Sequence, residues 1–207
     1  GLSDAYDGYT HHSIDDLAIM RAIPDMRVMV ASDAEQTRFL LRYAAETDGP
    51  MYIRLSRDAM NDLNRYGRLT FGKGSVLREG TDATILACGA LCGTACQAAA
   101  ELAKQNIHVR VADMFTIKPL DRELVIRSAR ETGALVTAEE HSVIGGLGGA
   151  VAETLTEAGA CVPVIRVGVS DTVTESGPYG QLLAHYGLDV TAVANAVERA
   201  LSLKRAH

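Results

Sequence analysis

The residues best suited to chemistry lie near the start of the sequence, in the stretch DAYDGYTHHS. Asp7 stands in an Asp-Gly turn, and His11 and His12 follow it closely. An imidazole with an ordinary pKa of about 6.5 gives or takes a proton at neutral pH, and a nearby carboxylate can accept a hydrogen bond from a substrate hydroxyl. These residue types predict a proton-transfer or substrate-binding loop. The alternative is a structural turn with two surface histidines, because Asp-Gly is a common turn dipeptide.

Metal binding is not favoured by the spacing of the potential ligands. The two adjacent histidines lack further ligands at a suitable spacing. Cys88, Cys92 and Cys96 recur every four residues, but no His or fourth Cys lies near them. We therefore expect no metal site, and we interpret these cysteines and Cys161 as small buried core residues in a reducing compartment.

Two arginines close a strand-like run, PMYIRLSR. The guanidinium groups of Arg54 and Arg57 could grip a phosphate with paired hydrogen bonds, or they could be the solvated end of an ordinary strand. Further along, His141 follows Glu139 and Glu140, which suggests an acid–base cluster. The GGLGG that comes next lacks the spacing of a dinucleotide-binding loop, so its glycines are better explained by a tight turn and a closely packed helix.

Composition excludes several classes of protein. The chain has 207 residues, of which 47% are hydrophobic and 22% charged, with a net charge of -6 and no basic run. This pattern argues against nucleic acid as a partner. No apolar stretch approaches the roughly 20 residues of a membrane span, so we expect no membrane association. Without a recognisable signal peptide, the expected localisation is cytoplasmic.

The first part of the chain alternates between helix and strand. Ser13 can cap a helix with Asp15 and Asp16 in its first turn, and Pro24 ends that helix. A strand at 26–32, a helix at 33–49 capped by Asp33 or Ser32, and a strand at 50–57 are expected to follow. Two strands are too few for an independent parallel sheet, so we expect the chain to begin partway through a domain.

After a polar, aperiodic segment that is typical of a linker, the alternation becomes regular. We expect strands at 82–88, 107–113, 133–140 and 162–169, and helices at 92–105, 121–131, 146–158 and 190–204. The strands are nearly continuous apolar runs, which is typical of strands covered on both faces by helices. The sequence therefore predicts an α/β domain with a mostly parallel sheet.

Several stretches resemble the transketolase family of thiamine diphosphate-dependent enzymes. DGYTHHSIDDLAIMRAIPDM resembles the family's Asp-Gly-Pro-Thr-His loop and the helix after it, and VASDAEQ with PMYIRLSR resembles the end of the pyrimidine-binding domain. AEEHSVIGGLGGAVAE and ESGPYGQLLAHYGLD resemble the C-terminal domain. The resemblance implies the C-terminal half of a thiamine diphosphate-binding (pyrimidine) domain at 1–60, a linker at 61–74, and a three-layer αβα transketolase C-terminal domain with a mostly parallel sheet at 75–207.

The resemblance also implies roles for individual residues. Asp7 and His11 would be the catalytic pair, Asp7 holding a substrate hydroxyl and His11 contacting a substrate oxygen near the developing charge. Arg57, and after it Arg54, would bind the sugar phosphate, with His12 as a further substrate contact. At position 9 a tyrosine replaces the family's usual proline, which we expect to change the stiffness of the loop and its specificity. In this family the stretch around His141 is remote from the chemistry, so we expect it to serve packing or an interface.

The implied activity is transfer of a two-carbon ketol unit between sugar phosphates, by an enzyme of which this chain is a C-terminal portion. The glutamate and aromatic residues that hold the aminopyrimidine ring should precede residue 1, and the metal–diphosphate motif belongs to another domain. We therefore expect thiamine diphosphate and Mg²⁺ in the complete enzyme, and none bound by this chain alone, which would be inactive. The expected assembly is a homodimer, or one that includes a separately encoded N-terminal subunit. The alternatives are a portion of a 1-deoxy-D-xylulose-5-phosphate synthase-like enzyme and a non-catalytic dimerisation or regulatory module.

Overall fold

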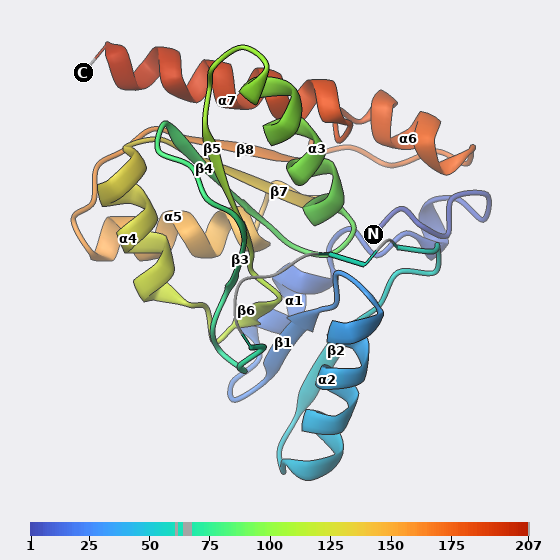
Figure 1. Cartoon of the computed structure of the whole chain (residues 1–207). Coiled ribbons are helices and arrows are strands. Elements are labelled where there is room, and N and C mark those ends of the chain that lie inside the picture. Colours follow the sequence, from blue (N-terminus) through green and yellow to red (C-terminus); the bar gives the residue numbers. More distant parts are fainter. Residues whose placement is uncertain (61, 64–67, 207) are drawn as a thin grey trace.

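The larger of two β-sheets has five strands in the order β3-β5-β4-β7-β8 (Figure 1). The structure, a computed structural model, describes residues 1–60, 62–63 and 68–206. Strands β4, β5, β7 and β8 are parallel, and β3 joins the edge beside β5 in the antiparallel direction. Their bounds are β3 (Ser75–Arg78), β4 (Ala83–Ala87), β5 (Val109–Asp113), β7 (Leu135–Ser142) and β8 (Val164–Val169).

Helices cover both faces of this sheet, which makes three layers (Figure 1). One face packs against α3 (Leu91–Ala103) and α7 (Val190–Arg205), and the other against α4 (Arg122–Thr132) and α5 (Leu147–Glu157). The central strand β4 is buried along its whole length, as its apolar sequence predicted. The expected α/β class and mostly parallel sheet are confirmed.

The smaller sheet has the order β2-β1-β6. Its parallel strands β1 (Arg27–Val30) and β2 (Met51–Arg54) alternate with α1 (Asp16–Ala22) and α2 (Ala34–Glu46). The third strand, β6 (Thr116–Lys118), comes from the later part of the chain and pairs antiparallel with β1. The later part of the chain therefore supplies the strand that the first part lacks.

The two sheets share one of the hydrophobic cores. Leu17 and Val30 from the first part of the chain belong to the same buried cluster as Leu86, Met114 and Leu147. A second cluster packs Met29 and Leu40 against Phe115, which directly precedes β6. The free energy gained by burying apolar side chains is roughly proportional to the apolar area removed from water. Because both parts of the chain bury side chains in this shared core, each part stabilises the other.

Several local expectations need correction. Helix α1 begins after Asp15 rather than at Ser13, and no side chain caps it, whereas the cap of α2 is Asp33, which accepts the Gln36 amide at 2.9 Å. The strands β3 and β6, the 3-10 helix η1 (Tyr9–His11) and the helix α6 (Tyr179–His185) were not predicted. Part of the predicted linker, residues 61 and 64–67, lies outside the described residues.

The four cysteines differ in burial. Cys88 and Cys92 are buried as expected, but Cys96 is only partly buried and Cys161 is exposed, so the prediction is wrong for Cys161. Among the described helices, none has the length and apolar character needed to cross a membrane.

Candidate functional site

The loop with the two histidines is a compact turn held by its own backbone. Gly8 has a φ of 79°, in the left-handed region that glycine tolerates best. The amide of His11 donates to the Gly8 carbonyl at 2.9 Å, and that of His12 to the Tyr9 carbonyl at 3.1 Å. These bonds form η1 and place consecutive side chains on different sides of the turn.

Asp7 and Arg57 lie together on the surface beside this turn. Arg57 Nη1 is 2.7 Å from Asp4 Oδ1 and 3.6 Å from Asp7 Oδ2, and the side chains of Arg57 and Asp7 are 69% and 48% exposed. The Arg57 amide also donates to the Ser3 hydroxyl at 3.0 Å. An exposed ion pair is weak in water, so this guanidinium can exchange its carboxylate partners for the anionic end of a ligand.

His11 is exposed at the tip of the turn. Its Nδ1 lies 3.1 Å from the Thr10 hydroxyl, which orients the ring without burying it. The imidazole therefore keeps access to a ligand, as a proton donor or acceptor would require.

His12 points the other way, into the protein. It is only 5% exposed, and its Nδ1 lies 2.7 Å from the hydroxyl of Thr174. Within the part of the chain that the structure describes, Nε2 has no hydrogen-bond partner. The structure thus separates the two histidines, one at the surface and one buried against the later part of the chain.

The two candidate arginines are separated in the same way. Arg54 is 9% exposed, and its guanidinium reaches Asp16 Oδ1 at 3.3 Å and the Glu140 carbonyl at 2.5 Å. Asp16 also accepts the Tyr52 hydroxyl at 2.7 Å, and burial with this carboxylate raises the pKa of Tyr52. Of the two arginines, Arg57 is the one that this geometry leaves available to a ligand.

Glu139 and Glu140, the two acidic residues before His141, accept hydrogen bonds from backbone amides and from a tyrosine. Glu139 accepts the amides of Leu147 and Gly148 at 2.6 and 2.8 Å, at the N-terminus of α5. Burial raises the pKa of Glu139 to about 7, and the two amides oppose this shift. Glu140 accepts the Tyr179 hydroxyl at 2.9 Å.

His141 itself is fully buried and satisfied on both nitrogens. Its Nδ1 donates to the Ser142 carbonyl at 2.8 Å, and its Nε2 accepts the amide of Ala18 at 3.3 Å. This pattern fits the neutral ring, and burial lowers the pKa of His141. The bond to Ala18 joins β7 to α1, so this cluster packs the two parts of the chain together.

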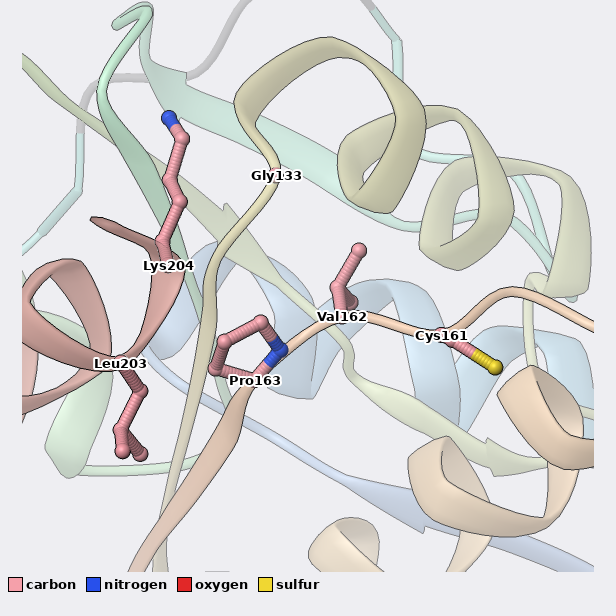
Figure 2. A pocket seen from close by; sticks show the side chains of 6 residues that line it. All are labelled: Gly133, Cys161, Val162, Pro163, Leu203 and Lys204. Carbon is pink, nitrogen blue, oxygen red and sulfur yellow. The ribbon is translucent and has the colours of Figure 1, made fainter. Parts of the chain in front are cut away.

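A pocket of about 530 Å³ lies at the amino ends of the parallel strands of the large sheet (Figure 2). It is lined by Gly133, Cys161, Val162, Pro163, Leu203 and Lys204, and Lys204 Nζ already donates to the carbonyls of Asp82 and Thr132. The pocket lies where the parallel strands begin, whereas ligands of such sheets usually bind where the strands end. None of the predicted site residues lines it.

The fold and the site together define an α/β protein with a mostly parallel sheet and a loop whose Asp7 pairs with the exposed Arg57 and whose His11 is exposed. Residues 1–62 match the family model described as "Transketolase, pyrimidine binding domain", and residues 72–193 match "Transketolase, C-terminal domain". The chain belongs to the transketolase family and corresponds to a C-terminal portion of such a protein.

Similar proteins include subunits of divided transketolases. A 6-deoxy-6-sulfo-D-fructose transketolase subunit from Clostridium sp. (strain MSTE9) is 44% identical over 99% of this chain and 63% of its own length. A subunit of an apulose-4-phosphate transketolase from Phocaeicola vulgatus is 42% identical over 88% of this chain and 58% of its own. The chain therefore spans less than two thirds of these relatives.

Two further comparisons bear on the fold and on the choice of activity. A split-gene transketolase whose structure is that of an inactive beta4 tetramer superimposes with a TM-score of 0.90 at 49% identity, over 96% of this chain and 65% of that one. A 1-deoxy-D-xylulose-5-phosphate synthase 1 from Geobacter sulfurreducens is 38% identical over 97% of this chain and 32% of its own length.

The family implies thiamine diphosphate in the complete enzyme, and the described residues do not fit that cofactor. Each buried acidic side chain already accepts a hydrogen bond within the chain, so none is a buried carboxylate without a partner that a ring nitrogen would have to satisfy; they are Asp33, Asp113, Asp121, Glu139 and Glu140. In residues 1–60, 62–63 and 68–206, no group of three or more His, Cys, Asp or Glu side chains could hold a metal ion.

Proposed function

We propose that the complete enzyme transfers a two-carbon ketol unit between sugar phosphates and that this chain supplies the substrate-binding loop. The observation that carries the proposal is that Arg57 Nη1 lies 3.6 Å from Asp7 Oδ2 and that the short loop with Asp7 also carries His11, all three side chains being exposed. The names of two relatives, a sulfofructose and an apulose phosphate transketolase subunit, support a sugar with an anionic end.

Each of the three side chains has a distinct role in this proposal. Arg57 binds the anionic end of the sugar, because a guanidinium matches phosphate or sulfonate oxygens. Asp7 accepts a hydrogen bond from a sugar hydroxyl. His11 moves a proton to or from the substrate oxygen that gains or loses charge during transfer, which neutral pH allows an exposed imidazole to do.

His12 and Arg54 remain proposed substrate-binding residues of lower rank, with an indirect role. Both are buried in the structure, at 5% and 9% exposure, and each already has a partner within the chain. Their contribution to substrate binding would therefore act through the position of the residues at the surface.

The cofactor and the assembly are part of the same proposal. The complete enzyme binds thiamine diphosphate with Mg²⁺, neither of which this chain holds alone, so the chain alone is inactive. A separately encoded N-terminal subunit and a second copy of the chain complete the enzyme in the cytoplasm. Exposed Tyr6, Tyr9 and Val173, at 75%, 46% and 63%, support a partner on this face, because exposed apolar groups often mark interfaces.

The second candidate is deoxyxylulose phosphate synthesis from pyruvate and glyceraldehyde phosphate. The 38% identity to a synthase over nearly the whole chain favours it as an alternative. Assays of the complete enzyme with a ketose phosphate donor and with pyruvate distinguish the two. Activity with neither donor would favour the non-catalytic dimerisation or regulatory module.

The central test of the site is His11→Ala in the complete enzyme. We expect kcat to fall by about 100-fold or more, because general acid–base groups contribute factors of this size. His108→Ala is a matched control, since His108 is also exposed but lies on the segment that enters β5, at the amino edge of the sheet. Equal turnover in the two variants would remove His11 from the chemistry.

A further inference from the structure

The loop that carries Asp7 and His11 is held by a segment from the far end of the chain. We name residues 172–178, which connect β8 to α6, the C-terminal clasp (Figure 1). The Gly177 amide donates to the Ala5 carbonyl at 3.1 Å. Ser176 Oγ lies against Gly8, so close that a Cβ added to Gly8 would be 2.5 Å from it.

One buried hydrogen bond anchors the C-terminal clasp to the loop. Thr174 is 4% exposed, although Val173 beside it is 63% exposed and most of the clasp faces solvent. Its hydroxyl lies 2.7 Å from His12 Nδ1, across 162 positions of the sequence. Because His12 Nε2 has no partner within the described residues, this bond is the polar contact that fixes the ring.

The C-terminal clasp is itself fixed to α6, which in turn contacts the large sheet. The Glu175 amide donates to the Tyr186 hydroxyl at 2.8 Å, just after α6. Tyr179 donates to Glu140 Oε1 at 2.9 Å, and the same oxygen accepts the Leu2 amide at 3.0 Å. The residue that follows the clasp, Tyr179, is therefore tied to β7, and the start of the chain is tied to the same Glu140 directly through Leu2.

We propose that the C-terminal clasp positions the substrate-binding loop, and that the Thr174–His12 hydrogen bond sets the placement of His11. The inference rests on the proposed function, since it assigns Thr174 and His12 as positioning residues of that same site. His11 and His12 are adjacent in a turn stabilised by two backbone bonds, so a shift of the His12 ring moves His11 with it. Reacting groups displaced by about 1 Å can lose a factor of about 100 in rate.

Three variants of the complete enzyme test this proposal. Thr174→Val removes the hydroxyl and keeps the buried shape, Thr174→Ser keeps the hydroxyl, and Thr172→Val is the control at an exposed threonine of the same clasp. The measurements are kcat and KM for the ketose donor, the melting temperature, and amide hydrogen exchange of residues 4–13.

We expect Thr174→Val to lower kcat by about 10- to 100-fold with a smaller change in KM, because loop placement governs the chemical step more than ground-state binding. Thr174→Ser should recover kcat to within about threefold of the parent enzyme, and exchange should accelerate in residues 4–13 of the valine variant alone. The melting temperature should fall by no more than about 4 °C.

Two results would overturn the proposal. One is a kcat for Thr174→Val within about twofold of that for Thr172→Val, with unchanged exchange in the loop. The other is faster exchange throughout the chain, which would make Thr174 a general stabilising residue. Faster exchange confined to the loop, combined with normal turnover in His11→Ala, would instead reject the proposed function and leave the clasp contact in place.

Discussion

Arg54 and Arg57 belong to one short segment and have opposite environments. Arg54 ends β2 and turns inward to Asp16 and the Glu140 carbonyl, whereas Arg57 lies beyond the strand at the surface with Asp4 and Asp7. A buried charge that loses its partner is costly, whereas an exposed ion pair contributes little. Stability and substrate binding should therefore depend on different arginines.

Replacing each arginine with methionine separates the two roles. Arg54→Met leaves the Asp16 carboxylate, which is 11% exposed, without its cation, and should lower the free energy of unfolding by about 3 kcal/mol. Arg57→Met should change it by less than about 0.5 kcal/mol while raising KM for the sugar phosphate at least about tenfold. Urea unfolding and steady-state kinetics of the complete enzyme measure both quantities. The reverse assignment, with KM dependent on Arg54 alone, would contradict the site.

Glu139 should give the stability of the protein a dependence on pH. Its pKa in the folded protein is about 7, above the ordinary value of 4.5, so the folded state binds this proton more tightly than the unfolded chain. The stabilising contribution is therefore complete below about pH 4.5 and is lost as the pH rises through about 7. Over that range the stability of the wild type relative to Glu139→Gln should fall by at most about 1.4 kcal/mol per pH unit.

Urea unfolding of the wild type and of Glu139→Gln, at about one pH value per pH unit between about 5 and 8, measures this difference in unfolding free energy. A difference that stays constant with pH would mean that Glu139 does not titrate in the range given by its burial. If the two helix amides outweighed burial and lowered the pKa of Glu139, the difference would be constant over this range and would grow with rising pH only below the ordinary value of 4.5.

At the scale of elements, the main contact between the two parts of the chain is the antiparallel pairing of β6 with β1. Phe115, just before β6, is fully buried, packs edge-on against Phe39 with ring centroids 6.1 Å apart, and accepts the Val30 amide at 2.9 Å. The strand thus inserts into the smaller sheet with an aromatic anchor at its start. The two sheets should unfold together, because they also share a core.

Phe115→Ala tests this coupling. The variant should lose about 3 to 5 kcal/mol of unfolding free energy, as is usual for removal of a buried phenylalanine, and should still unfold in one transition. Leu41→Ala, on a residue that is 51% exposed, should change stability by less than about 0.5 kcal/mol. Urea unfolding followed by far-ultraviolet circular dichroism and by tyrosine fluorescence provides the two probes. Separate transitions for the two probes would show that the sheets are independent.

Sequence patterns located the parallel strands and the long helices but missed several short elements. The four parallel strands of the large sheet are apolar runs bounded by turns, so periodicity and composition located them. The strand β6 has only three residues and exists because β1 offers it a free edge, which local sequence does not encode. Helix α1 lacks a side-chain cap, so the cap signal at Ser13 was misleading.

The candidate site was only partly predictable for the same reason. The DGYTHH motif predicted Asp7 and His11 as site residues, which stays a prediction, whereas the burial of His12 and Arg54 involves Thr174 and Glu140, which are distant in sequence. A single threonine in an exposed segment has no sequence signature. The ESGPYGQ stretch next to it pointed to the right region through its resemblance to the family, without indicating the contact.

For the whole molecule, the observations divide the proposed enzyme between this chain and the rest of the protein. The loop with Asp7 and His11, the exposed Arg57 and the C-terminal clasp lie at one end of the large sheet. Glu139 and Glu140 are hydrogen-bonded within the chain, and the described residues include no group of three or more His, Cys, Asp or Glu that could hold a metal ion. The proposal gives the substrate loop to this chain and the cofactor site to the rest of the enzyme.

The most direct measurement of that division is a calorimetric titration of the purified 207-residue chain with Mg²⁺ and thiamine diphosphate, repeated after the remaining part of the enzyme has been added. We expect no heat of specific binding for the chain alone and binding with a dissociation constant of about micromolar order for the mixture. Binding of that strength by the chain alone would contradict the division, because it would place a cofactor site within these residues.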